Sequence, residues 1–300
     1  MKYIVTGGAG FVGSHLVKLL VNEGHIVTVI DNLHTGKKEN LRSVIQQITF
    51  KKVDIRNYEE LEKIMKNIDG VFHQAALTVV QDSFKNPQEY HDVNVDGTEN
   101  IFKLAQKNNF KVVYASSSSV YGHKKDMPIN EDTLREPINP YGQTKLDTEF
   151  LFEKYTKIGT KIIGLRYFNI FGQGQTLEYA GVITKFLERI KENKSPIIFG
   201  DGTQIRDFIF VKDIVMANLL AMESQVSNSL VNIGTGKAVT ILELANMIIE
   251  SSGKNLKPIF KNSLEGDIRK SQADISLSIK YFNWKPKKDL QDWLKEIFSE

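Results

Sequence analysis

A tyrosine and a lysine four residues apart, together with a run of serines, could carry chemistry in this sequence. Tyr141 and Lys145 lie in a segment of helical periodicity and so share one helix face, while Ser116–Ser119 end a strand-like run. The pKa of a free tyrosine is about three units too high for its phenolate to form at neutral pH and act as a base. A nearby ammonium can lower this pKa by about one to three units. The set could therefore take a proton from a substrate hydroxyl that Ser117 holds in line. The alternative interpretation of the pair is an amphipathic surface pair.

A glycine-rich turn offers a place for a dinucleotide. Gly7, Gly10 and Gly13 stand at GxxGxxG spacing, directly after the strand-like run Tyr3–Thr6 and at the start of a helical pattern. Such a loop lets a diphosphate approach the backbone and the positive end of the helix. Asp31 closes the second strand-like run, where an acidic residue binds a ribose 2′-hydroxyl and repels the 2′-phosphate of NADP, so NAD is favoured. A turn-forming carboxylate is the alternative for Asp31.

Strand-like and helical segments alternate along the first half of the chain. The strand-like runs are Tyr3–Thr6, Ile26–Ile30, Ile48–Val53, Gly70–His73, Val112–Ala115 and Lys161–Arg166, and in the second half Pro196–Phe199, Phe208–Phe210, Leu230–Ile233 and Pro258–Phe260. The helical patterns are Phe11–Glu23, Tyr58–Lys66, Asp92–Lys107, Tyr141–Lys157, Val182–Glu192, Asp213–Glu223, Ile241–Ser251 and Leu290–Ile297. This alternation predicts an α/β fold, a Rossmann-type doubly wound parallel sheet with a smaller, interleaved α/β substrate lobe. We expect an NAD-binding domain over residues 1–170 and a substrate lobe over 171–300, with parts of 207–240 returning to the first domain.

Composition narrows the class of protein. The 300 residues are 41% hydrophobic and 25% charged, with a net charge of +3, which is ordinary globular composition and far from that of a dedicated nucleic-acid binder. The absence of cysteine excludes disulfides and thiol nucleophiles. No apolar run is long enough for a bilayer or a signal peptide. We therefore expect a cytoplasmic protein with no metal and with no nucleic-acid or membrane partner.

Motifs along the whole chain resemble those of a known family. They are Thr6–Gly13, Asp31-Asn32-Leu33 with Thr35-Gly36, Asn94-Val95 with Gly97-Thr98 and Asn100, Ser116–Gly122, Tyr141 with Lys145, Arg166-Tyr167-Phe168-Asn169, Gly200-Asp201-Gly202, Arg206-Asp207-Phe208, Asn232–Gly236 and Gly266-Asp267-Ile268. On these residues the chain is identified as an extended short-chain dehydrogenase/reductase of the NAD-dependent epimerase/dehydratase family. It is similar over essentially its whole length to the nucleotide-sugar 4-epimerases.

The resemblance implies an activity and a set of residues for it. The implied reaction interconverts UDP-glucose and UDP-galactose, and their N-acetyl forms as well, by transient oxidation at C4 with bound NAD. Ser117, Tyr141 and Lys145 would be catalytic, and Lys145 would also hold the nicotinamide ribose. The residues implied to bind the cofactor are Gly7, Gly10, Phe11, Val12, Gly13, Asp31, Asn32, Gly36, Asp54, Ile55, Ala75, Ala76, Asn94, Lys145 and Tyr167.

The resemblance also places the UDP-sugar. The residues implied to bind it are Leu77, Ser118, Asn169, Val182, Phe199, Arg206, Phe208, Asp267 and Ser271. Core packing is the alternative for Phe208. Ser271 stands where relatives limited to plain hexoses often have a bulky aromatic, and its alternative role is to cap the segment that follows. Leu264 replaces an arginine common in relatives, for which Arg269 or Lys261 could compensate.

Other reactions on the same fold remain alternatives. Dehydratases and decarboxylases of the superfamily tend to have acidic residues after the catalytic hydroxyl residue, where this chain has Ser118 and Ser119. A UDP-glucuronate 4-epimerase, another nucleotide-sugar oxidoreductase and a non-catalytic NAD-binding regulator stay open. Relatives also suggest a homodimer formed through a four-helix bundle of Asp92–Lys107 and Tyr141–Lys157, and the alternative is that the apolar faces of these helices are internal core.

Overall fold

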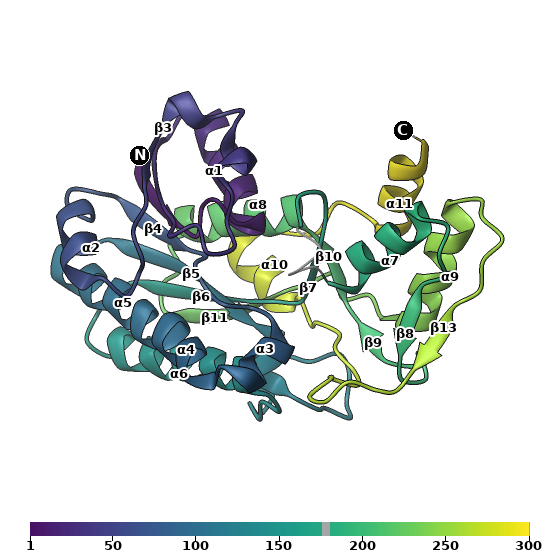
Figure 1. Cartoon of the computed structure of the whole chain (residues 1–300). Coiled ribbons are helices and arrows are strands. Elements are labelled where there is room, and N and C mark those ends of the chain that lie inside the picture. Colours follow the sequence, from purple (N-terminus) through teal and green to yellow (C-terminus); the bar gives the residue numbers. More distant parts are fainter. Residues whose placement is uncertain (176–180, 300) are drawn as a thin grey trace.

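Seven parallel strands form the central sheet of the computed structural model, which describes residues 1–175 and 181–299 (Figure 1). The strand order is β11-β6-β5-β4-β1-β2-β3. These strands are β1 (Lys2–Thr6), β2 (Ile26–Ile30), β3 (Ile48–Lys51), β4 (Gly70–His73), β5 (Lys111–Ser117), β6 (Ile162–Tyr167) and β11 (Ser229–Ile233). The chain winds outward from β1 in both directions, so the ligand-binding edge lies at the carboxyl ends of β1 and its neighbours.

Helices cover both faces of this sheet because its strands are apolar on both sides. On β1, Tyr3 and Val5 face one core with α1 and α8, while Ile4 faces the other with α2, α5 and α6. The helices around the sheet are α1 (Phe11–Asn22), α2 (Tyr58–Ile64), α5 (Gly97–Asn108), α6 (Pro140–Thr156), α8 (Val211–Glu223) and α10 (Ser276–Phe282). Every helix of the described residues is too short or too polar to span a membrane. The predicted doubly wound parallel sheet is confirmed.

A smaller part of the molecule follows β6 and has a core of its own. Phe186, Leu244 and Leu294 are buried together there on three helices. Its elements are β7 (Asn169–Phe171), α7 (Val182–Lys191), β8 (Ile197–Phe199), β9 (Ile205–Arg206), β10 (Phe208–Phe210), β12 (Val239–Thr240), α9 (Ile241–Ser251), β13 (Ile259–Lys261) and α11 (Leu290–Ser299). The pairs are β10 with β7, β12 with β9, and β13 with β8. Between them the chain returns to the main sheet as α8 and β11, while the domain division at residue 170 stays a prediction.

The structure differs from the predicted elements mainly around short helices. The helix predicted over Asp92–Lys107 begins at Pro87, the first residue of α4, and passes through a π-helical turn before α5. The sequence analysis did not anticipate α3 or α10, since segments of six or seven residues show too little periodicity. The remaining elements are α3 (Val80–Lys85), α4 (Pro87–His91), the π-helical η3 (Asp92–Asp96) and the 3₁₀ turns η1 (Lys38–Leu41), η2 (Ile45–Gln47) and η4 (Ser118–Tyr121).

Candidate active site

A cavity of about 980 Å³ follows the carboxyl ends of the sheet strands and continues into the smaller part of the molecule. It extends from the glycine loop, past the serine run, to β8 and the segment after β13. The predicted site residues that line it are Gly7, Gly10, Phe11, Val12, Gly13, Asp31, Asn32, Ile55, Ala75, Ala76, Leu77, Ser117, Ser118, Tyr141, Lys145, Tyr167, Asn169, Val182, Phe199, Arg206, Asp267 and Ser271. Residues predicted from motifs far apart in the sequence therefore share one cavity.

Four predicted site residues lie outside the lining. Phe208 is buried in the core of the smaller part, because β10 pairs with β7 there and packs its side chain inward. Asn94 is fully buried, and its amide bonds both the N–H and the C=O of Leu77, at 2.8 and 3.0 Å. Phe208 thus packs as its alternative interpretation expected and Asn94 holds a lining segment in place, while their direct contacts with a ligand stay predictions.

The other two residues, Asp54 and Gly36, contact residues that line the cavity. The carboxylate of Asp54 accepts hydrogen bonds from Arg56, at 2.8 and 2.9 Å, and from the amide of Asn32. At Gly36 an added Cβ would lie 2.8 Å from both carboxylate oxygens of Asp31, so glycine leaves room for that side chain. Neither residue is among those that line the cavity, but each contacts a residue that does, and their direct contacts with the cofactor stay predictions.

The glycine loop has the geometry of an anion site. Gly7 has a φ of +66°, and a Cβ on Gly13 would lie 2.1 Å from the carbonyl oxygen of Gly7. Helix α1 begins behind this turn, and its N-cap, Gly10, provides no side-chain hydrogen bond to the first-turn N–H groups. Phe11, Val12 and Gly13 of this turn line the cavity, and the free N–H groups of a helix's first turn can bind a diphosphate.

Asp31 completes a site for a dinucleotide. Its carboxylate accepts from the N–H of Ala9 in the glycine loop at 2.9 Å and from Leu33 at 2.8 Å. Burial raises the pKa of Asp31, and these two N–H groups oppose that shift. A buried carboxylate beside the loop leaves little room for the 2′-phosphate of NADP, so the residues present fit NAD.

Ser117, Tyr141 and Lys145 meet in the middle of the cavity. Ser117 ends β5 and caps η4, accepting from the N–H of Ser119 at 3.1 Å. Tyr141 lies in the first turn of α6, and its N–H donates to Ser83 Oγ at 3.1 Å. Lys145 Nζ donates to the carbonyl of Ala115 at 2.9 Å and lies 5.9 Å from the centre of the Tyr141 ring. The end of β5 and the start of α6 thus hold the three side chains together.

The electrostatics of this group are those of a buried site. Burial lowers the pKa of Lys145 to about 8, and the negative charge of Glu149 partly opposes that shift. Burial raises the pKa of Tyr141, and a hydrogen bond with Ser117 lowers it. A further positive charge beside Tyr141 is therefore needed before its phenolate can form at neutral pH.

A buried charge network supports the group from behind, and the sequence analysis did not predict it. Arg166 donates to both carboxylate oxygens of Glu149 at 2.8 Å, and the hydroxyl of Ser116 donates to the same carboxylate at 2.6 Å. Glu149 lies on α6 one turn after Lys145, while Ser116 belongs to β5 and Arg166 to β6. The network therefore ties α6 to both strands. The detectable signal was Arg166 itself, a charge within the apolar strand β6.

Charged residues of both signs line the far end of the cavity, and the acidic ones include Glu188 and Glu192. Arg206 pairs with Asp267 at 2.5 Å, and both line the cavity. Neither Arg269 nor Lys261 lies among the lining residues, whereas Lys185 and Arg189 of α7 do. Val182, Lys185 and Arg189 are three and four residues apart and so share one face of α7. This spacing in the sequence indicates that Lys185 and Arg189 lie on the same side of the helix as the predicted site residue Val182.

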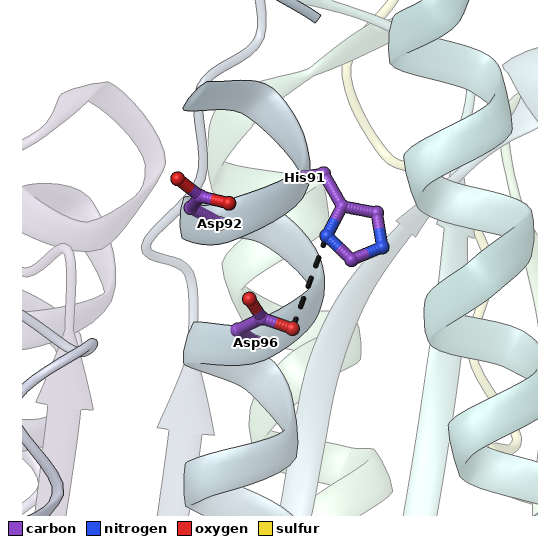
Figure 2. Close-up of side chains that lie close together, drawn as sticks. All are labelled: His91, Asp92 and Asp96. Atoms are coloured by element: carbon purple, nitrogen blue, oxygen red, sulfur yellow. Dashed lines mark ion pairs between the residues drawn. The ribbon is translucent and has the colours of Figure 1, made fainter. Parts of the chain in front are cut away.

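One group of possible metal ligands lies on the surface of the described part of the chain. His91, Asp92 and Asp96 have ligand atoms within 4.8 Å of one another, and Figure 2 shows the ion pair of His91 with Asp96, at 3.8 Å. His91 and Asp96 are exposed, and Asp92 also accepts from Gln88 at 2.7 Å. The chemistry proposed below does not use this cluster.

Comparisons with known proteins agree with this geometry. The model of the NAD dependent epimerase/dehydratase family matches residues 3–234. The UDP-glucose 4-epimerase of Lactobacillus helveticus is 34% identical, and the alignment covers 97% of this chain and 94% of that protein.

Solved structures match the whole chain. The UDP-glucose 4-epimerase of Thermotoga maritima with UDP-glucose is 36% identical, with a TM-score of 0.95 over 100% of this chain and 98% of that one. The UDP-N-acetylglucosamine 4-epimerase of Methanobrevibacter ruminantium, in complex with UDP-N-acetylmuramic acid, is 38% identical, with a TM-score of 0.93 and coverages of 99% and 97%. The UDP-glucuronic acid 4-epimerase of Bacillus cereus, in complex with UDP-glucuronic acid and NAD, is 33% identical, with a TM-score of 0.93 and coverages of 100% and 98%.

Proposed function

The chain belongs to the NAD-dependent epimerase/dehydratase family, and from this premise we propose that it is a UDP-glucose 4-epimerase that also accepts the N-acetyl sugars. The observation that carries the proposal is one cavity that joins the glycine loop, the Ser117, Tyr141 and Lys145 group, and the charged end at Arg206. A dinucleotide, a reacting sugar carbon and a nucleotide diphosphate each have a matching set of groups there.

The protein's own residues have distinct roles in this reaction. Tyr141 takes the proton of the C4 hydroxyl and later returns one to the 4-keto oxygen. Ser117 donates a hydrogen bond to the same oxygen and aligns it. Lys145 supports the tyrosine electrostatically and binds the ribose. When bound, NAD⁺ supplies a reversible hydride acceptor at C4 and a positive charge beside Tyr141.

The residues beside Ser117 favour epimerisation over dehydration. Removing water from the sugar requires an acid and a base in addition to the tyrosine, and carboxylates fit that task at neutral pH. Ser118 and Ser119 line the cavity at these positions, and a serine hydroxyl does not ionise at neutral pH. The proposed reaction is therefore oxidation and re-reduction at one carbon.

The same two serines support UDP-glucuronate as a second candidate substrate. Hydroxyl groups can donate hydrogen bonds to a sugar carboxylate, and two of them lie next to Ser117 in the cavity lining. The UDP-glucuronic acid 4-epimerase of Bacillus cereus, which is 33% identical to this chain, holds UDP-glucuronic acid in its solved structure.

One assay tests the reaction and ranks the substrates. The purified protein is incubated with UDP-glucose, UDP-N-acetylglucosamine and UDP-glucuronate, without added NAD, and the 4-epimers are resolved by chromatography. We expect UDP-galactose from UDP-glucose. Stable accumulation of NADH absorbance, with no 4-epimer, would instead indicate a dehydrogenase. Turnover of none of the three sugars would contradict the proposal.

We also propose that two copies of the chain assemble through α5 and α6. Phe150 of α6 supports this, because its side chain is 50% exposed although it is large and apolar. The oligomeric state measured by light scattering tests this assembly.

A further inference from the structure

A short segment after β13 forms one wall of the cavity. Leu264, Gly266 and Asp267 line the cavity, and Asp267 holds Arg206 there. We call residues 264–267 the strap, because they run from the smaller part of the molecule across to α3 and the start of α6.

Two side chains of the first half hold the backbone of the strap. Gln81 of α3 donates from Nε2 to the carbonyl of Glu265 at 3.0 Å. Asn139 donates from Nδ2 to the carbonyl of Gly266 at 3.2 Å. Consecutive carbonyls of the strap are thus bonded to two elements on the other side of the cavity.

The strap also packs very closely against these elements. Gly266 has a φ of +70°, and an added Cβ would lie 2.9 Å from the ring of Phe84 and 3.2 Å from Cβ of Asn139. Only glycine fits such an approach without displacing a neighbour. The position of the strap is therefore set by α3 and by Asn139, and not only by its own part of the molecule.

Asn139 has a second role at the same time. Its Oδ1 accepts from the N–H of Gly142 at 2.8 Å and so caps α6, whose second residue is Tyr141. The side chain is buried, with 6% exposure. One amide therefore bonds the catalytic helix through its oxygen and the substrate wall through its nitrogen.

We propose that Asn139 is a positioning residue that fixes the strap, with Asp267 and Arg206, at a set distance from Tyr141. The inference rests on the proposed function, since it concerns binding of the nucleotide part of the substrate. The cap acts on the catalytic helix and the strap bond acts on substrate binding, so changing the two separately should affect different kinetic constants.

The substitution Asn139→Ser separates the two roles. Serine is a good N-cap, so α6 keeps its cap, but its side chain is too short to reach the carbonyl of Gly266. Loss of one hydrogen bond of ordinary strength predicts a KM for UDP-glucose that rises about three- to tenfold. We expect kcat to stay within about twofold, because the group at Tyr141 is retained. Asn139→Ala loses the cap as well, and kcat should then fall too.

A matched control is available at another helix. Asn57 caps α2 by accepting from the N–H of Glu60 at 3.1 Å, is exposed and is not a lining residue. Asn57→Ser makes the same chemical change at the same helical position and should leave both constants unchanged. Gln81→Ala removes the other strap bond without touching a cap, and should raise KM in the same direction as Asn139→Ser.

Calorimetric titration with UDP alone separates this inference from the proposed function. We expect weaker UDP binding by Asn139→Ser and Gln81→Ala than by the wild type and Asn57→Ser, whichever sugar is the substrate. A wild-type KM and UDP affinity in Asn139→Ser would overturn the role of Asn139. A wild type that binds UDP but epimerises no UDP-sugar would overturn the proposed function, while the UDP affinities would still test the strap.

Discussion

Tyr141 needs a lowered pKa, and the protein alone provides little of that lowering. Burial raises the pKa of its hydroxyl, and only the hydrogen bond with Ser117 acts in the other direction. From the sequence, a neighbouring ammonium is expected to lower this pKa by about one to three units, and the positive nicotinamide ring of NAD⁺ is expected to lower it by more. In the structure the ammonium of Lys145 donates to the carbonyl of Ala115. In the proposed mechanism, the positive charge of bound NAD⁺ beside Tyr141 would lower this pKa further.

Tyr141→Phe tests this role directly. Phenylalanine keeps the ring and removes the only group that can accept the proton, so the variant should fold and bind NAD. Turnover should fall by at least about 10²-fold, the usual size of a positioned acid–base contribution. Circular dichroism and NAD binding serve as controls, and near-normal turnover would contradict the mechanism.

Ser271 is the predicted gate for the sugar. It is buried and lines the cavity on the segment that follows the strap, and its N–H donates to the carbonyl of Ile205 at 3.1 Å. A close-packed wall cannot absorb the extra atoms of an N-acetyl group, whereas a small side chain leaves space for them.

We therefore expect the wild type to epimerise both UDP-glucose and UDP-N-acetylglucosamine. Ser271→Tyr should suppress turnover of the N-acetyl sugar and spare that of UDP-glucose, as measured by kcat/KM for each. If the variant treats the two sugars as the wild type does, another part of the wall, beginning with Leu77 and Ser118, determines the specificity.

At the scale of elements, the hydrophobic periodicity of the sequence predicted most helices and strands, and it did not predict the short irregular segments. The strands of the sheet and the glycine loop followed from apolar runs and spacing, and so did the position of Tyr141 and Lys145. The partners of Asn94 and Glu149 did not, because a buried polar contact joins residues that the sequence keeps far apart. Phe208 shows the same limit, since an aromatic in a strand can face either a ligand or a core.

His73 joins three elements and gives a test of the fold by pH. It lies buried at the end of β4, with Nδ1 2.7 Å from the hydroxyl of Thr6 on β1 and Nε2 2.9 Å from that of Thr98 on α5. Thr98 donates its own proton to the carbonyl of Asn94, so the neutral ring donates from Nε2. Burial, with a smaller effect from the charge of Lys145, lowers the pKa of His73 to about 3.

The sign of the effect on stability follows from this pKa. Between pH 6.5 and 3 His73 is protonated in the unfolded chain and neutral in the folded chain. The contribution of His73 to the free energy of unfolding is therefore fully present above pH 6.5 and is lost as the pH falls. Protonation of His73 in the unfolded chain should lower the free energy of unfolding by about 2 kcal/mol between pH 7 and pH 5. His73→Gln should remove this part of the pH dependence in urea unfolding, whatever its stability at pH 7. An unchanged difference between the two pH values would contradict the buried neutral ring.

For the whole molecule, the structure narrows the surface on which two copies could meet. Most apolar residues of the two helices in the proposed bundle are internal core, and those buried are Val93, Val95, Ile101, Phe102, Leu104, Ala105, Leu146, Phe152 and Tyr155. Phe150 is the exposed exception, and the guanidinium of Arg135 lies 5.4 Å from its ring centre. Around it the surface carries ion pairs, among them Glu99 with Lys103 and Lys154.

A dimer through this face would have one aromatic anchor from each copy within a largely polar surface, and a few buried residues of an interface carry most of its binding energy. We expect the wild type to be a dimer by light scattering at micromolar concentration. Phe150→Asp should be a monomer, because it places a carboxylate at the centre of the contact. Its thermal unfolding should shift little at high dilution, since an exposed side chain contributes little to the monomer's own core. Phe260→Asp, at a similarly exposed phenylalanine on β13, is the matched control and should remain a dimer. A wild type that scatters as a monomer at micromolar concentration would refute the assembly, and a dimer that survives Phe150→Asp would move the interface to another surface.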